Sequence, residues 1–245
     1  MAINWFKYSA PSTFYGVAGK MIPWFAASSV LLFILGLYLG FFVAPSDVQQ
    51  SEAYRIMFIH VPVSILSMLI YLVMAGYAAL GLIFNTRLSA MMASSLAPTG
   101  ALFAFLSLWT GALWGKPMWG AWWVWDARLT SELILLFLYL GFIALHASID
   151  DPRRADRASA LLAIIGSVNV PIIYFSVQWW NTLHQGATIK LTGTTMHVAM
   201  QQSLLVMFLA CWLYVITMAL LRVRSIILER ERNNQWVMEL TEMKP

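Results

Sequence analysis

Six mostly apolar stretches, each of about 20 residues or more, constrain the fold of this chain more than any other feature. They cover residues 21–43, 56–84, 91–113, 129–149, 158–177 and 203–221. A helix needs about 20 such residues to cross the hydrocarbon core of a bilayer. In lipid, only helices and closed barrels pair every backbone polar group. The pattern therefore predicts an all-α, polytopic integral membrane protein built as a six-helix bundle.

Prolines inside the second, third and fifth stretches lead us to expect irregular helices there. Pro98 is followed by Thr99 and Gly100, which makes the third stretch the weakest of the six. Pro62 and Pro171 are expected to kink the second and fifth helices, because proline lacks the N–H that bonds one turn back. The first stretch is too long for the apolar core of a cleaved signal peptide, so we expect it to remain as a signal anchor.

Composition excludes several classes of function. Hydrophobic residues make up 60% of the chain and charged residues 11%, against roughly half and a quarter in soluble domains. The net charge of +4 is scattered along the chain, so nothing indicates nucleic-acid binding. The Gly-Lys pairs at 19–20 and 115–116 lack the rest of a Walker A motif. The single cysteine, Cys211, supports neither an intrachain disulfide nor a paired-cysteine motif.

The distribution of lysine and arginine predicts the orientation in the membrane, because short cytoplasmic loops are enriched in both. With the N-terminus inside, most of the 15 basic residues fall on the cytoplasmic side and few outside. The inner set is Lys7, Lys20, Arg87, Arg153, Arg154, Arg157, Arg222, Arg224, Arg230, Arg232 and Lys244, and the outer set is Arg55, Lys116, Arg128 and Lys190. We therefore expect both termini in the cytoplasm, with outer loops at 44–55, 114–128 and 178–202.

The second outer loop is rich in tryptophan. It begins the sequence WGKPMWGAWWVWDARLTSE at 114–132, and its five indole rings are Trp114, Trp119, Trp122, Trp123 and Trp125. An aromatic belt at the membrane interface explains one or two of them. If residues 118–124 are helical, three of the rings share one face. Such a face suits a large planar ligand, a lipid or a partner helix, and the composition does not decide between a ligand platform and a belt or partner surface.

Histidines flank this loop on both sides. His60 follows the first outer loop, and His184 and His197 lie in the third, whereas His146 lies at the cytoplasmic end of the fourth helix. Neutral imidazole is a common axial ligand of haem iron, and two of them fill both axial positions. His60 and His184 are one candidate pair, and His197 is the competitor that spacing does not exclude. Without a CxxCH motif, any haem would be held non-covalently.

Charged residues at the same boundary have two interpretations each. Arg55 and Arg128 suit the bidentate binding of haem propionates, or they anchor the helix ends at the interface. Lys116 would bind propionate less specifically. Asp126 is expected to cap the N-terminus of the fourth helix, with a role near the site as the alternative. Glu132 is spaced to pair with Arg128 at i, i+4, again with a supporting role near the site as the alternative.

The run WGAWWVWD at 119–126 fits the WGxxWxWD signature of haem-handling membrane proteins. Within that superfamily the chain resembles the haem exporter protein C family of bacterial cytochrome c maturation. The resemblance covers most of the chain, including YRIMFIHVP at 54–62, WGKPMWGAWWVWDARLTSELILLFLY at 114–139 and WWNTLHQG at 179–186.

The resemblance implies a bacterial inner-membrane protein that binds haem b at its periplasmic face. His60 and His184 would be the axial ligands, and the tryptophan-rich loop would lie against the porphyrin. The haem would pass to a periplasmic haem chaperone. A small single-span membrane protein and the ATPase and permease subunits of an ABC transporter would be further partners in this transfer. Attachment to the chaperone would be promoted by positioning, so no catalytic residue is predicted. We expect one domain over 1–245, with the haem loop at about 114–128 and a cytoplasmic tail at about 222–245.

Three rival functions remain at this stage. The six helices would form a path that moves haem across the bilayer, although their cores hold few polar residues. Alternatively, the chain is a scaffold subunit of the transporter complex whose tryptophans only dock the chaperone, which predicts no bound haem. A quinone-binding or lipid-binding protein would not need the two histidines.

Overall fold

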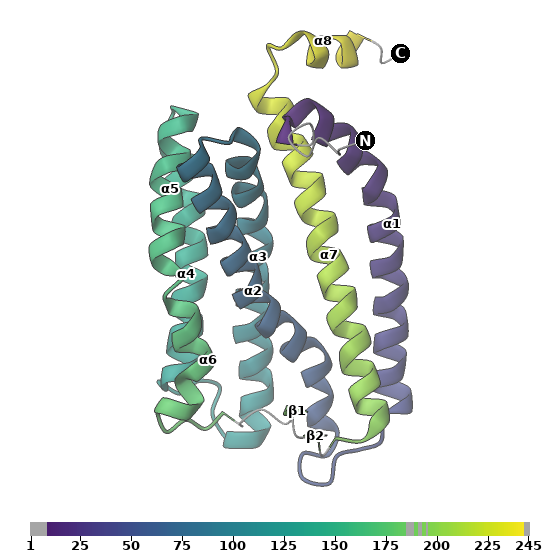
Figure 1. The fold of residues 1–245 in the computed structure, drawn as a ribbon. Helices are drawn as coiled ribbons and strands as arrows, with labels where there is room; N and C mark the ends of the chain where they lie inside the picture. The colour runs from purple at the N-terminus through teal and green to yellow at the C-terminus, as the bar shows by residue number, and fades with distance from the viewer. Residues whose placement is uncertain (1–8, 185–188, 191–192, 195, 243–245) are drawn as a thin grey trace.

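The computed structural model describes residues 9–184, 189–190, 193–194 and 196–242, and nearly all of them lie in helices (Figure 1). In chain order, the elements are α1 (Pro11–Tyr38), a π-helical turn (Leu39–Val43), a 3-10 turn (Glu52–Ile56), α2 (Met57–Phe84), α3 (Arg87–Trp119), α4 (Ala127–Ala147), α5 (Pro152–Gly166), α6 (Asn169–Trp179), β1 (Ile189–Lys190), β2 (Gly193–Thr194), α7 (Val198–Arg230) and α8 (Gln235–Glu242). The two short strands pair antiparallel.

Six helical stretches in the described part of the chain are long and apolar enough to span a membrane. This confirms the predicted fold class. The helices extend further than the apolar stretches do: α3 runs from Arg87 to Trp119 and α7 from Val198 to Arg230. Their outer turns are built from polar and aromatic residues that suit the interface, which is why hydropathy alone placed the ends too close together.

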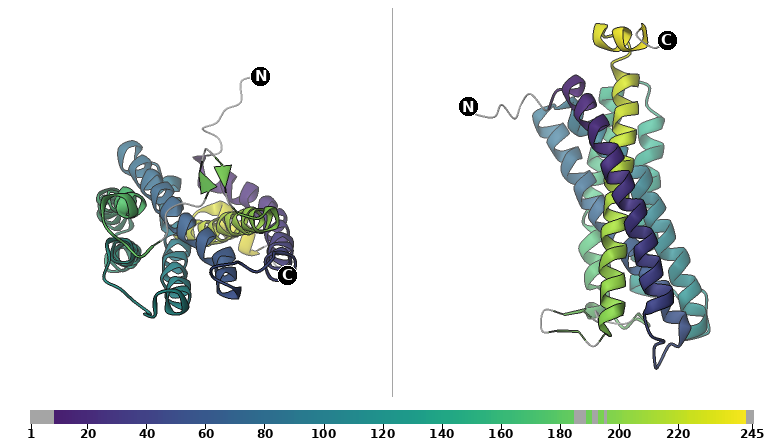
Figure 2. Two further views of the ribbon diagram at one scale, coloured as in Figure 1. Left: turned by 90° about the horizontal axis from the view of Figure 1, so that it is seen from below. Right: turned by 90° about the vertical axis from the view of Figure 1, so that its right-hand side faces the viewer.

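The bundle has two parts. Helices α1 and α7 pack on each other along most of their length and form one side, while α2 to α6 form the other (Figures 1 and 2). The start of α1 and the whole of α8 lie at the same end of the bundle, as an even number of crossings requires (Figure 1). At that end Trp236 of α8 packs against Tyr15 of α1, with ring centroids 5.7 Å apart. The Arg224 guanidinium lies 4.2 Å from the Tyr15 ring.

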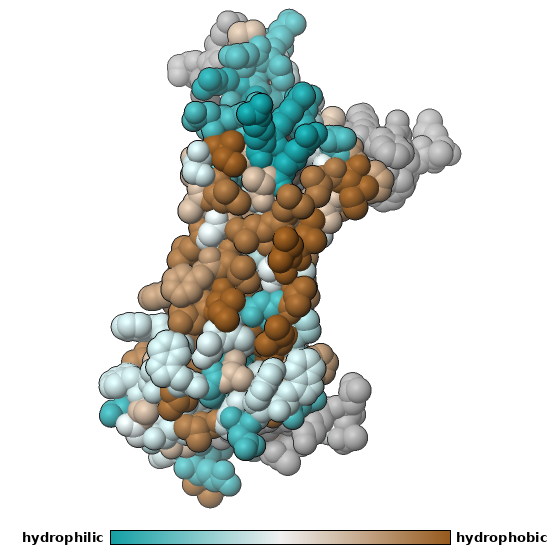
Figure 3. Space-filling view, turned by 90° about the vertical axis from the view of Figure 1, so that its left-hand side faces the viewer, coloured by the Kyte–Doolittle hydropathy of each residue, from teal (hydrophilic) through white to brown (hydrophobic). Residues whose placement is uncertain are grey.

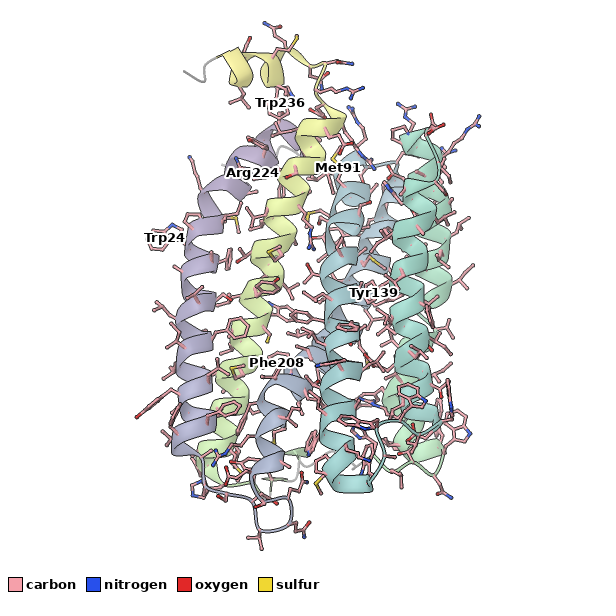
Figure 4. All side chains as sticks on the ribbon, turned by 180° about the vertical axis from the view of Figure 1, so that it is seen from behind. Trp24, Met91, Tyr139, Phe208, Arg224 and Trp236 are labelled. Carbon is pink, nitrogen blue, oxygen red and sulfur yellow. The ribbon has the colours of Figure 1, made fainter. Side chains whose placement is uncertain are left out.

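The core of the larger part depends on close helix approaches. Tyr139 of α4 points into the bundle (Figure 4), is fully buried and donates a 2.7 Å hydrogen bond to the Ser67 carbonyl of α2. A Cβ atom at Gly100 of α3 would lie 2.1 Å from the Tyr139 ring. Only glycine therefore allows α3 to pass this tyrosine, and the glycine that weakens the third stretch as a sequence pattern has a packing function.

The prolines lie in two kinds of place. Pro62 and Pro98 both lie inside continuous helices, α2 and α3. The fifth stretch is instead divided into α5 and α6 by a turn at 167–168. Pro171 lies in the first turn of α6 and has no N–H to give to the Ser167 carbonyl, so the helix breaks where that donor is missing.

The surface agrees with a membrane-spanning protein. An apolar band covers the middle of the molecule, and hydrophilic residues gather at both ends (Figure 3). Large apolar side chains point outward, among them Trp24, which is 77% exposed and projects away from α1 (Figure 4). Since burying such side chains in lipid is favourable, this band is where the bilayer is expected to lie.

Candidate functional site

His60 lies in α2, one turn beyond its start, and is almost fully buried. Its Nδ1 atom lies 2.9 Å from Thr110 Oγ1 of α3. The Thr110 hydroxyl donates its single hydrogen to the Leu106 carbonyl at 2.6 Å, so its oxygen accepts from His60 Nδ1–H. The proton is thereby placed on Nδ1, and Nε2 keeps the lone pair that a metal ligand needs.

His184 is the histidine that lies beside His60. The two ring centroids are 6.5 Å apart, with 36° between the ring planes. His197, the competitor from the sequence, is exposed and is the N-cap of α7. Its Nδ1 accepts a hydrogen bond from the Ala199 N–H. The tertiary structure thus brings together one of the two possible histidine pairs.

A cavity of about 80 Å³ is lined by both histidines and lies where the start of α2, the end of α3 and the start of α4 meet. Trp114 and Trp119 form part of its wall, and the His60 and Trp114 rings meet edge to face at 5.7 Å. Gly111 faces the His60 ring, because a Cβ there would lie 3.1 Å from His60 Cε1. The cavity is therefore small and lined by two imidazoles, by indole rings and by several polar side chains.

The tryptophan-rich segment is not the helical platform that the spacing suggested. Helix α3 ends at Trp119, where Gly120 adopts a left-handed conformation with φ of 76°, and residues 120–126 are non-helical. A shared helical face for Trp122 and Trp123 is therefore wrong, because the glycine terminates the helix before them. Two of the five tryptophans, Trp114 and Trp119, line the cavity.

The other three tryptophans form a more open surface. Trp122 is 55% and Trp125 78% exposed. The Lys116 ammonium lies 6.0 Å from the Trp122 ring, and Trp123 and Trp125 meet edge to face at 5.3 Å. Trp122 and Trp125 can therefore contact a ligand edge, a lipid or a protein partner at this end of the bundle.

The acidic residues after the loop have separate functions. Asp126 is the N-cap of α4, as predicted, and its carboxylate accepts a 2.8 Å hydrogen bond from the Leu129 N–H. Glu132 is buried and lines the cavity, where one oxygen accepts from the Ser67 hydroxyl at 2.9 Å and the other is buried without a hydrogen-bond partner. Its predicted ion pair with Arg128 is wrong, because Arg128 donates instead to the Ile173 carbonyl of α6 at 2.8 Å.

The two outer arginines also differ. Arg128 lines the cavity. Arg55 does not, because its guanidinium binds Glu52 and the Gly40 and Ala44 carbonyls at the end of the first helical stretch. These contacts fasten the first outer loop to the bundle and favour the anchoring interpretation of Arg55.

Comparison with known proteins identifies the family. The model for heme exporter protein C matches residues 4–238. Heme exporter protein C of Escherichia coli K12 is 48% identical over 234 residues, which are 96% of this chain and 95% of that protein. The chain belongs to the heme exporter protein C family.

Other relatives in this family extend the comparison. Heme exporter protein C of Bradyrhizobium diazoefficiens is 46% identical over 235 residues, covering 95% of this chain and 89% of the relative. A ccmC-like mitochondrial protein of Marchantia polymorpha, whose name places it in cytochrome c biosynthesis, is 45% identical over 194 residues, covering 79% and 82%.

Several polar residues in or beside the cavity were not identified from the sequence, because no motif or unusual spacing marks them. Gln50 lines the cavity and accepts a 2.9 Å hydrogen bond from Trp114 Nε1. Ser64 and Ser107, whose hydroxyls lie 2.6 Å apart, and Thr110 belong to α2 and α3. Such small polar residues are common in membrane helices, and only the pairing of the two helices shows which of them meet beside His60.

Proposed function

We propose that this protein binds haem b non-covalently at the periplasmic face of the bacterial inner membrane and passes it to a periplasmic haem chaperone during cytochrome c maturation. His60 and His184 would be the axial ligands of the iron. The membership of the heme exporter protein C family and the Marchantia relative's name support haem handling in cytochrome c biosynthesis. The observation that carries the ligand assignment is the spacing of the two imidazoles.

That spacing suits one metal ion between two rings. Metal–imidazole bonds are about 2 Å long, so two of them on opposite sides of one iron put the ring centroids roughly 6 Å apart. The observed separation is 6.5 Å. In the described part of the chain no cluster of three or more His, Cys, Asp or Glu side chains has the arrangement of a metal site. A two-ligand site whose other donors come from a macrocycle therefore fits this chain better than an all-protein metal centre.

The walls fit a flat aromatic ligand that stays partly outside. The cavity that both imidazoles line, about 80 Å³, is far smaller than a porphyrin, so Trp114 and Trp119 enclose only the central part of such a ligand. Trp122 and Trp125 are exposed beyond it. Arg128 lines the same cavity and is the arginine placed to bind a propionate. These residues supply an apolar surface, a cation and an open edge.

When bound, haem supplies the iron and the peripheral group that becomes linked to the chaperone. The residues of this chain bind and orient it. The His60 and His184 imidazoles would ligate the iron and keep oxygen from it, and the Thr110 hydroxyl would hold His60 in the tautomer whose Nε2 is free to ligate. Promotion of transfer by positioning needs no catalytic side chain. We propose that the small single-span protein and the ABC transporter subunits act with this chain, whose two termini face the cytoplasm.

Absorption spectra of the purified protein, oxidised and reduced, test this proposal. The parent should show a low-spin bis-histidine spectrum, and His60→Ala and His184→Ala should each lose haem or become high-spin. His197→Ala is the matched control and should keep the parent spectrum, because His197 caps α7 away from the cavity. A parent without haem, even when purified with the chaperone, would support the scaffold alternative. A parent spectrum retained in either His60→Ala or His184→Ala would refute the ligand pair.

A further inference from the structure

A larger cavity lies at the opposite end of the bundle from the two histidines. It measures about 500 Å³ and is bounded by the end of α2, the start of α3 and the start of α5. The end where both α1 begins and α8 lies is strongly hydrophilic (Figures 1 and 3), and the charge distribution predicts that it faces the cytoplasm. No feature of the haem site extends to this cavity.

Three arginines line the cavity: Arg87, Arg153 and Arg157. The single acidic residue on the wall is Asp156, whose two oxygens are each bound by Arg230 at 2.7 Å. His146 Nε2 lies 3.1 Å from the same carboxylate. Asp156 is therefore neutralised by its own partner and does not balance the arginines of the cavity.

The arginines themselves have little competition for an anion. Among the described residues, the one ion pair they make is Arg87 with Glu231, at 3.8 Å and with 67% of the Arg87 side chain exposed. Glu231 is buried, but the long distance and the exposed guanidinium make this a weak pair that leaves Arg87 able to bind an anion. Helix α3 also begins at this cavity, and no side chain caps its first N–H groups. The end of α2 lies at the same cavity and opposes the dipole of α3, so the positive potential at the mouth comes from the three guanidinium groups.

The rest of the wall is largely apolar, with Asn85, Thr86, Ser94 and Ser159 as its uncharged polar members. Ala78 and Leu82 of α2, Ala90 and Ala93 of α3 and Ala160 of α5 leave the space that forms the cavity. A free phosphate would bind the cations and leave this wall in contact with water. A ligand with both an anionic head and an apolar chain covers both surfaces.

We propose that this cavity binds an anionic phospholipid. Its phosphate would pair with Arg87, Arg153 and Arg157, and an acyl chain would lie against the alanines between α2, α3 and α5. Basic pockets between membrane helices on the cytoplasmic side are suited to this ligand, because anionic lipids concentrate there. The site is separate from the haem cavity, so it does not depend on the haem proposal.

The site can be tested by native mass spectrometry of the full-length protein, delipidated in detergent. The binding of added phosphatidylglycerol is compared with that of added phosphatidylcholine. Phosphatidylglycerol should bind more tightly, and Arg153→Gln with Arg157→Gln should weaken it by about tenfold or more. Arg232→Gln is the matched control, because Arg232 is exposed at the same end and does not line the cavity. Equal binding of the two lipids, or a double variant that binds like the parent, would overturn the proposal.

A second variant separates a lipid from a free anion. Ala90→Phe fills the apolar part of the cavity and leaves all three arginines in place. It should abolish phosphatidylglycerol binding while inorganic phosphate binds as weakly as before. If phosphate competes with the lipid at equal concentration and Ala90→Phe changes nothing, the site is one for a free anion. If a protein subunit alone occupies the cavity in the purified complex, the lipid proposal is likewise wrong. The circular dichroism spectrum and the thermal unfolding midpoint should stay unchanged in every variant and report that the bundle is folded.

Discussion

The hydrogen bond from His60 Nδ1 to Thr110 Oγ1 allows a specific test of the haem site. Thr110→Val keeps the volume of the side chain and removes its oxygen. The buried Nδ1–H would then lose its acceptor at 2.9 Å. His60 would still be present beside the Ser107 backbone, but the side-chain hydrogen bond that sets its tautomer and orientation would be lost.

The expected size follows from the burial of the pair. His60 and Thr110 are 9% and 7% exposed, so water does not readily replace the lost acceptor. Leaving a buried donor unpaired costs about 1–3 kcal/mol, which is roughly a 5- to 150-fold change in an equilibrium constant. Loss of a residue that orients a metal ligand typically weakens metal binding by about 10–100-fold. We therefore expect haem binding to weaken by about 10–100-fold.

The assay is a haem titration of apo-protein followed by the Soret band, with the reduced spectrum recorded at saturation. Thr110→Ser keeps the hydroxyl and should restore most of the affinity. Thr217→Val is the matched control, because Thr217 is equally buried and bonds only the Leu213 carbonyl of its own helix. If Thr110→Val binds haem like the parent, or if Thr217→Val weakens binding as much, the assigned function of Thr110 is wrong.

Two further predictions concern the helices that hold the site. Gly100→Ala should lower the free energy of unfolding by about 1–3 kcal/mol, because its Cβ would lie 2.1 Å from the Tyr139 ring. Gly76→Ala is the control and should not lower it, since the new Cβ would meet nothing within 4 Å. Equal thermal unfolding of the two variants would contradict the packing argument. Asp126→Ala should lower the free energy of unfolding by about 1 kcal/mol, because it removes the cap that bonds the Leu129 N–H. Asp126→Asn should keep most of this stability, since its amide oxygen can still accept the bond. A fall in melting temperature as large for Asp126→Asn as for Asp126→Ala would show that the charge of Asp126, and not its cap, matters.

Much of the site's location is already present in the sequence. Hydropathy places His60, the tryptophan-rich segment and His184 at helix ends, and the basic residues put these ends on one side of the membrane. The cap at Asp126 was also predictable, because capping depends on a few neighbouring residues. The errors are equally local in origin: the helical face at 118–124 was assumed from spacing, but Gly120 terminates α3.

What the sequence by itself determined is the class of fold, the number of helices and the end of the bundle where the chemistry lies, since each depends on the apolarity of consecutive residues. Only the tertiary structure decided that His184 and not His197 lies beside His60. It also decided that Arg128 bonds the Ile173 carbonyl rather than Glu132, and that Thr110 directs the His60 proton. These contacts join segments that are far apart in the chain. The packing of whole helices selects them, and no short-range pattern contains that information.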